Sequence, residues 1–198
     1  PEKDTDYKIA LPVDSTYDGK PCEASVWTRT GVGEVTVWYN DSTALPVRAG
    51  TYNVVVEIAS SENFSAVQRM NIGSFTINKR TISLNTTALK IEDKTCNGRD
   101  DDARISGLAF SNLPEGAALS EGTDYTLSTR YASAKAGEWD VTVTVTLTNK
   151  NYTLEDKKCT VKGKILPEAV ELIVSAKDAV YTGLPYSESN LTCSGTSA

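Results

Sequence analysis

The sequence predicts an all-β chain of tandem small β-sandwich modules of the immunoglobulin-like type, with β-grasp-like modules as the alternative. Three observations lead to this fold class. Short segments alternate between apolar and polar residues, glycine-containing turns separate them, and the same motifs occur more than once. Thr, Ser, Val and Tyr are abundant, and such side chains fit a pleated, half-buried sheet. A length of 198 residues allows two small domains.

The expected strands follow from period-two patterns. The first ones lie at 35–39, 52–58 and 74–78. The clearest lies at 139–147, where valines and threonines alternate and must point to opposite faces. A further strand at 170–174 begins the last part of the chain in the same style. The two best helix candidates are too short to be stable alone.

Two stretches of the chain repeat each other, and a third begins to. The stretch 49–56 (AGTYNVVV) reappears at 136–143 as AGEWDVTV. The turn at 17–21 (YDGKP) has counterparts at 96–98 (CNG) and 181–185 (YTGLP). Repeated motifs in a fixed order indicate an array of modules.

The repeats set the expected domain boundaries. One β module covers 1–79, a second covers 80–166, and a third begins at 167–198. The junctions between them are short and lack the Gly/Ser or Pro runs of a flexible tether. We therefore expect a semi-rigid array in which one module's last strand leads directly into the next module's first.

The repeated motif residues have expected structural roles. Glycine reaches positive φ without steric cost, and Asp or Asn before it tolerates a turn. The aromatic residues of the motifs are expected to fill the cores. The motif residues are Tyr17, Asp18, Gly19, Gly50, Tyr52, Asn97, Gly98, Gly137, Trp139, Tyr181 and Gly183.

The order of these motifs resembles the tandem YDG and MBG repeats of bacterial surface proteins. The first module carries the resemblance at 17–21, 49–52, 63–64 and 75–79. The second departs from it at 96–97, where Cys-Asn replaces the family's usual Tyr-Asp. The resemblance implies a bacterial extracellular or cell-surface location and no catalytic residues. It implies a non-catalytic structural or spacer region, such as part of an adhesin stalk.

A binding module for host glycan or protein is the alternative function. Exposed aromatic side chains stack on sugars and anchor interfaces. Trp27, Trp38 and Tyr39 are the candidate aromatic patch, because Trp27 and Trp38 flank a Gly-Val-Gly turn that could place both indoles on one side. The same three side chains could instead fill the core. The partner would be a protein or glycan at the cell surface.

Composition excludes other classes of function. The net charge of −6 argues against nucleic acid and against docking on an anionic membrane, and no apolar run is long enough for a membrane span. Histidine is absent, which removes the commonest general base and transition-metal ligand. The acidic run 100–102 lacks the spacing of a calcium loop. We expect no enzyme activity, no metal and no cofactor.

The cysteines suggest a covalent link in the second module. In the motif alignment Cys96 falls at the place of Tyr17, and Cys159 at the place of Phe75. If the two aromatic residues touch in the first module, the two cysteines could form a disulfide in the second, as an oxidising location would allow. The alternative is a pair of buried free thiols.

The tail at 167–198 predicts self-association. It contains a first strand and a turn of the module but no counterpart of the Ala-Gly strand. A remnant of this size is marginal in water, so we expect another chain to cover it by strand addition or swapping.

Overall fold

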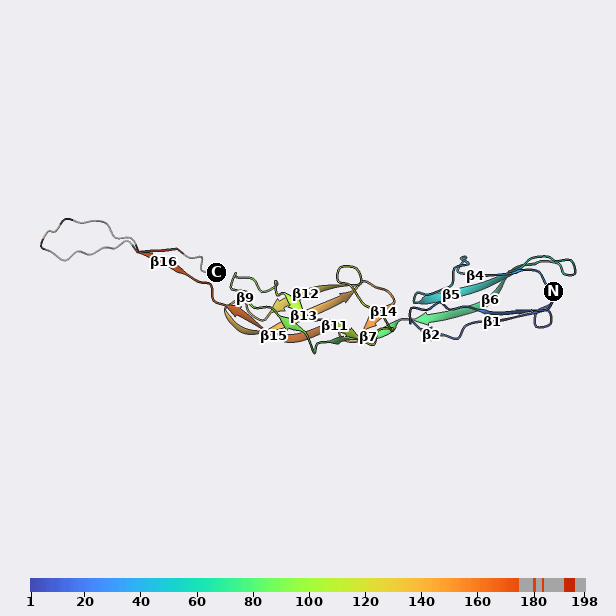
Figure 1. Cartoon of the computed structure of the whole chain (residues 1–198), viewed down its shortest axis with the longest axis horizontal. Helices are drawn as coiled ribbons and strands as arrows, with labels where there is room; N and C mark the ends of the chain where they lie inside the picture. Colours follow the sequence, from blue (N-terminus) through green and yellow to red (C-terminus); the bar gives the residue numbers. More distant parts are fainter. Residues whose placement is uncertain (175–179, 181–182, 184–190, 195–198) are drawn as a thin grey trace. The chain divides into compact units, whose positions relative to one another are not determined.

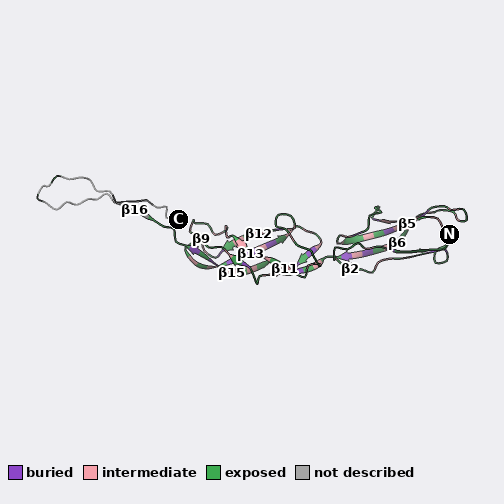
Figure 2. Ribbon diagram, in the orientation of Figure 1, coloured by how far each residue is buried: buried purple, intermediate pink, exposed green. Residues whose placement is uncertain are grey.

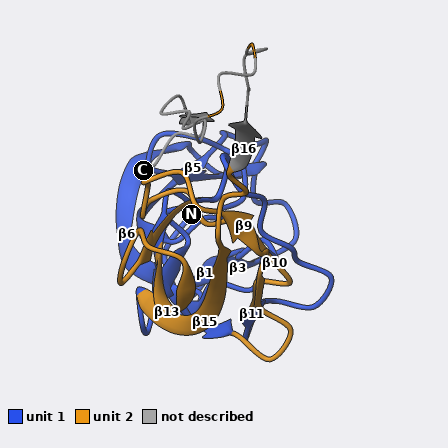
Figure 3. Ribbon diagram, turned by 90° about the vertical axis from the view of Figure 1, so that its left-hand side faces the viewer, with its two compact units in different colours: residues 1–85, 110–126, 145–157 blue, residues 86–109, 127–144, 158–198 orange. Residues whose placement is uncertain are grey.

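The computed structural model describes residues 1–174, 180, 183 and 191–194. The chain is all-β, as the sequence predicts (Figure 1). The described residues contain no helix long and apolar enough to cross a membrane. The chain divides into two compact units (Figure 3): unit 1 comprises Pro1–Asn85, Phe110–Thr126 and Val145–Lys157, and unit 2 comprises the remainder. The module boundaries expected from the repeats stay a prediction.

In chain order, the strands are β1 (Tyr7–Ala10), β2 (Ser15–Thr16), β3 (Ser25–Thr28), β4 (Val35–Tyr39), β5 (Gly50–Ile58), β6 (Val67–Asn78), β7 (Arg80–Asn85), β8 (Lys90–Ile91), β9 (Lys94–Thr95), β10 (Ile105–Ser106), β11 (Ala109–Ser111), β12 (Tyr125–Tyr131), β13 (Gly137–Leu147), β14 (Tyr152–Leu154), β15 (Lys158–Leu166), β16 (Glu171–Val174) and β17 (Leu191–Ser194).

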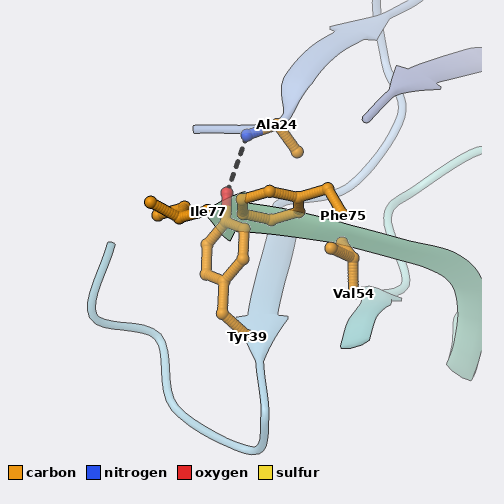
Figure 4. Close-up of a cluster of buried hydrophobic side chains, with 5 residues drawn as sticks. All are labelled: Ala24, Tyr39, Val54, Phe75 and Ile77. Carbon is orange, nitrogen blue, oxygen red and sulfur yellow. Dashed lines mark hydrogen bonds between the residues drawn. The ribbon is translucent and has the colours of Figure 1, made fainter. Parts of the chain in front are cut away.

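Unit 1 contains a sandwich of two layers. One layer is a four-stranded sheet in the order β2-β6-β5-β4, with β2 parallel to β6 and the other pairs antiparallel. The other layer is the antiparallel pair β1–β3. The core lies between them, where Ala24 packs with Tyr39, Val54, Phe75 and Ile77 (Figure 4).

Buried and exposed positions alternate along the sheet strands (Figure 2). On β5, Val54, Val56 and Ile58 are fully buried because they face the β1–β3 layer. On β13, Val141 and Val143 are fully buried, whereas the threonines between them are not. The valine face predicted for 139–147 is therefore confirmed.

A second four-stranded sheet has the order β9-β15-β13-β12, which matches the order β2-β6-β5-β4 strand for strand. In both sheets the outer short strand runs parallel to its neighbour, and the two central strands are antiparallel. The registers also match, because Gly50 lies opposite Ile77 and Gly137 lies opposite Ile165. Ile91 of the separate pair β8–β10 packs against the buried Tyr131, Val141 and Ile165 of this sheet.

The remaining strands form two small sheets. A three-stranded sheet has the order β11-β7-β14, with β14 parallel to β7, and it buries Ile82 and Leu154. β7 begins at Arg80, directly after β6 ends at Asn78, so no flexible tether separates these strands. The antiparallel pair β16–β17 follows. Tyr181 lies outside the described residues, and self-association through 167–198 stays a prediction.

The disulfide proposed between Cys96 and Cys159 is absent, and both cysteines are free thiols. The N–H of Cys96 donates to the carbonyl of Leu166 (2.8 Å), at the last residue of β15. Cys159 lies at the opposite end of β15, opposite Val143. Such a length of strand spans about 20 Å, whereas the Cα atoms of a disulfide lie within about 7 Å of each other.

The disulfide prediction is wrong because the motif alignment placed β15 in the wrong register relative to β6. Both Ile77 and Ile165 are buried and both lie opposite the glycine that opens the central strand. The residue two positions earlier is Phe75 in β6 and Gly163 in β15. Gly163, not Cys159, therefore takes the place of Phe75.

Candidate functional site

The two motif turns are built alike. The side-chain oxygen of Asp18 accepts a hydrogen bond from the N–H of Lys20 (2.9 Å), and that of Asn97 accepts one from the N–H of Arg99 (3.0 Å). The glycine between each pair has a positive φ, 80° in the first turn and 75° in the second. Both turns are closed by an Asx hydrogen bond and depend on glycine.

The motif aromatic residues brace their own strands. Tyr52 stacks on Phe75 with ring centroids 5.6 Å apart, and its hydroxyl donates to the carbonyl of Arg48 (2.8 Å). The indole N–H of Trp139 donates to the carbonyl of Lys135 (2.7 Å), also four residues back. The polar atoms of these side chains are thus engaged with the backbone.

Unit 1 also joins the first turn to residues far along the chain. The ring of Tyr17 packs edge-on against Tyr152, with centroids 5.3 Å apart. The guanidinium of Arg80 donates to the carbonyl of Tyr17 (3.3 Å). The N–H of Ala49 donates to the side-chain oxygen of Asn151 (2.9 Å). These contacts hold β14 and the start of β7 against the first turn.

The three residues of the candidate aromatic patch lie in different surroundings. Tyr39 is buried, and its hydroxyl accepts the N–H of Ala24 (2.8 Å, Figure 4). Trp38 points to the outer face of the four-stranded sheet, where the guanidinium of Arg69 lies 3.9 Å from its ring centroid. Trp27 is 52 % exposed.

Trp27 and Trp38 do not share a face. On β1, Tyr7 and Ile9 pack into the core, so Lys8 and its register partner Trp27 point outward from the β1–β3 layer. Trp38 points outward from the other layer. Of the three candidate residues, Trp27 therefore remains as the exposed one, with the ammonium of Lys8 5.8 Å from its ring centroid.

A polar cluster closes the second turn. The ammonium of Lys94 donates to the side chains of Asn97 (3.0 Å) and Asp102 and to the carbonyl of Arg99 (2.6 Å). The amide of Asn97 donates to the other oxygen of Asp102 (2.8 Å). Hydrogen bonds from Lys94 and then from Asn97 lower the pKa of the Asp102 carboxyl.

Each acid of the run 100–102 has its own cation. Asp100 pairs with Arg130 (3.1 Å), Asp101 with Arg99 (3.1 Å), and Asp102 with Lys94. No group of His, Cys, Asp or Glu side chains disposed to hold a metal ion occurs in the part of the chain that the structure describes. The run thus acts as a set of ion pairs.

A groove of about 730 Å³ lies between β3 and β4 in unit 1. Its walls come from the segment leading into β3 and the first residues of β3, from β4 with the residue before it, and from the loop after β4. The lining residues are Glu23, Ala24, Ser25, Val26, Glu34, Val35, Thr36, Val37, Tyr39, Thr43 and Leu45. The groove and Trp27 are the candidate interaction surfaces of unit 1.

Residues 11–81 match the family model of the MBG domain. This segment begins just before β2 and ends in β7, so it contains the whole four-stranded sheet of unit 1, the first motif turn and both walls of the groove. The resemblance to the MBG family is confirmed for this segment, which is an MBG-type domain and which we call the MBG segment. No curated protein matches the sequence.

Proposed function

We propose that the chain is a non-catalytic mechanical spacer region of a bacterial secreted or cell-surface protein, such as part of an adhesin stalk. The MBG segment supports this proposal, because repeats of this type belong to bacterial surface proteins. The matched strand order and registers of the two four-stranded sheets support a tandem repeat with modules at 1–79 and 80–166.

The observation that carries the proposal is the parallel pairing of β2 with β6, in which Ser15 lies opposite Ile77 and Thr16 opposite Asn78. β2 is near the start of the MBG segment and β6 is near its end. Tension along the chain therefore pulls two parallel strands in opposite directions, and all their hydrogen bonds must fail together. Further bonds reinforce the pair, since the N–H of Tyr17 donates to the carbonyl of Asn78 (2.8 Å).

A similar parallel pair, which we also call a shear clamp because its hydrogen bonds must break together under tension, occurs in unit 2. β9 runs parallel to β15, with Lys94 opposite Ile165 and Thr95 opposite Leu166. The N–H of Cys96 extends this pair by its bond to Leu166. A chain with a shear clamp at each of two places is suited to transmit force between its ends.

Stretching the full chain by its termini in single-molecule force spectroscopy tests the proposal. We expect discrete unfolding events at high force that recur after relaxation, because each clamp fails cooperatively and can refold. A chain that extends gradually, without force peaks, would contradict a mechanical role.

A binding role is the second candidate, and the exposure of Trp27 favours it. An exposed indole beside the Lys8 ammonium offers a surface on which a sugar ring or an interface side chain can stack. Trp27→Ala should abolish binding to a glycan or host-protein array, whereas Trp38→Ala should leave it unchanged. An array without any ligand for the unaltered chain would refute this candidate and leave the mechanical one intact.

A further inference from the structure

The free edge of β4 presents backbone groups to the groove. The N–H of Ala59 donates to the carbonyl of Glu34 (2.9 Å), which extends the β4–β5 ladder by one pair. Hydrogen-bonded and non-bonded pairs alternate in an antiparallel ladder. Val35 and Val37 therefore stand in non-bonded pairs, and their N–H and C=O groups turn away from β5.

The free edge of β3 follows by the same reasoning. The N–H of Arg29 donates to the carbonyl of Asp6 (2.7 Å), which extends the β1–β3 ladder. Alternation then turns the N–H and C=O of Val26 away from β1. The N–H of Ala24 turns the same way, and Tyr39 already accepts it.

These two edges face each other across the groove. Consecutive residues of both strands line it, as happens when a backbone edge rather than one side-chain face forms a wall. β3 and β4 are each the last strand of their sheet on this side. From strand and sheet spacings, one extended residue fills about 160 Å³, so the groove of about 730 Å³ holds a short strand of a few residues.

We propose that this groove binds an extended basic peptide segment, which adds as a strand to β3 and β4 at once. The carboxylates of Glu23 and Glu34 are the charged groups of its lining, so the groove is acidic. Val26 and Leu45, 39 % and 40 % exposed, provide apolar contacts. A segment that alternates apolar and basic residues matches this lining, because successive side chains of a strand point to opposite faces. The proposal goes beyond the spacer function.

The edge strand of the second sheet is covered by its own chain. The N–H of Tyr131, on β12, donates to the carbonyl of Asp100 (2.6 Å). The hydroxyl of Thr129 donates to the carbonyl of Ala103 (3.0 Å). Because the segment at 100–103 occupies this edge, we expect one peptide site per chain.

An octapeptide of alternating valine and lysine, capped at both ends, is the probe for the full chain. We expect one bound peptide by calorimetry, with amide shifts at Val26, Val35 and Val37 in NMR spectra. The matched control is the same peptide N-methylated at alternate residues, which removes the donors of one edge and should weaken binding at least tenfold. Equal affinity of the two peptides, shifts elsewhere, or no binding up to millimolar concentration overturns the proposal.

Charge recognition is tested separately. The double variant Glu23→Gln/Glu34→Gln should bind the valine–lysine peptide several-fold more weakly and lose most of the salt dependence. Glu115→Gln, an exposed position outside the groove, is the control and should bind normally. A valine–glutamate peptide that binds as well as the valine–lysine peptide overturns the choice of a basic partner. If no peptide binds to the groove, the unfolding peaks expected in force spectroscopy are unaffected. The peptide-binding proposal and the spacer proposal can therefore fail independently.

Discussion

Trp139 holds in β13 the position that Tyr52 holds in β5. Each stands two residues after the glycine that lies opposite a buried isoleucine, and each donates a hydrogen bond to the carbonyl four residues before it. Their cross-strand neighbours differ, because Tyr52 faces Phe75 and Trp139 faces Gly163. The two sheets thus share a backbone plan and fill their cores differently.

Gly163 is required by this different core. A Cβ atom there would lie 2.8 Å from methyl groups of Ile91 and Val141 and 3.0 Å from the ring of Tyr131. Gly163→Ala should therefore destabilise unit 2 by about 1–3 kcal/mol, measured by hydrogen exchange of β13 amides. Gly50→Ala is the control, since nothing lies closer than 3.8 Å to its added Cβ. Equal effects of the two substitutions would contradict the packing described for Gly163.

Two buried tyrosines should respond in opposite ways to the loss of their hydroxyl. The hydroxyl of Tyr131 is buried and has no hydrogen-bond partner among the described residues, and burial raises its pKa, so it stays neutral. Tyr131→Phe should be neutral or stabilise by about 1 kcal/mol. Tyr39→Phe should cost about 1–3 kcal/mol, because the N–H of Ala24 loses its acceptor. Thermal unfolding measures both, and a costly Tyr131→Phe would show that its hydroxyl is bonded.

Asp102 makes stability depend on acid pH. Because its pKa is lowered in the folded state, its stabilisation is present above the unfolded pKa of about 3.9 and is lost as pH falls through the folded value. Asp102→Asn should cost about 1 kcal/mol at pH 7, and the difference from the unaltered chain should shrink below about pH 4. Urea titrations at both pH values measure this.

Asp101→Asn is the control for Asp102, since the Asp101 side chain is 60 % exposed and its ion pair lies in solvent. It should change stability little at either pH. If Asp102→Asn lowers the free energy of unfolding equally at both pH values, the contribution of Asp102 does not depend on its ionisation, which would contradict this prediction.

The sequence predicts the framework of the fold better than its details. Alternation at 139–147 and the Ala-Gly motifs were sufficient for the central strands, because the period of side chains decides which face is buried. The position of Cys159 depends on the register of β15. A motif alignment cannot fix this register, because β15 has no aromatic residue at the place of Phe75. The three aromatic candidates failed to form one patch because neighbours in sequence, such as Trp38 and Tyr39, point to opposite faces of a strand.

The groove had no sequence signal. Which strand lies at an edge depends on the strand pairing of the whole sheet. Which backbone groups of Val35 and Val37 face outward depends on which residue pairs of the β4–β5 ladder are hydrogen-bonded. The covered edge at Tyr131 depends likewise on a loop contact with Asp100.

The free state of the cysteines is directly measurable. Alkylation of unfolded, unreduced protein followed by peptide mapping should label both Cys96 and Cys159, since the length of β15 separates them. Reduction should then leave the melting temperature unchanged. A linked pair of peptides containing these two cysteines would contradict the register of β15.

The resistance of the β2–β6 pair to force should depend on the direction of pull. Val13 lies just before β2 and is 86 % exposed, Lys20 lies after β2, and Lys79 follows β6. Handles at Val13 and Lys79 shear the parallel β2–β6 pair, whereas handles at Lys20 and Lys79 peel the same bonds one after another. We expect a much higher unfolding force for the first attachment than for the second. Equal forces in the two geometries would contradict it.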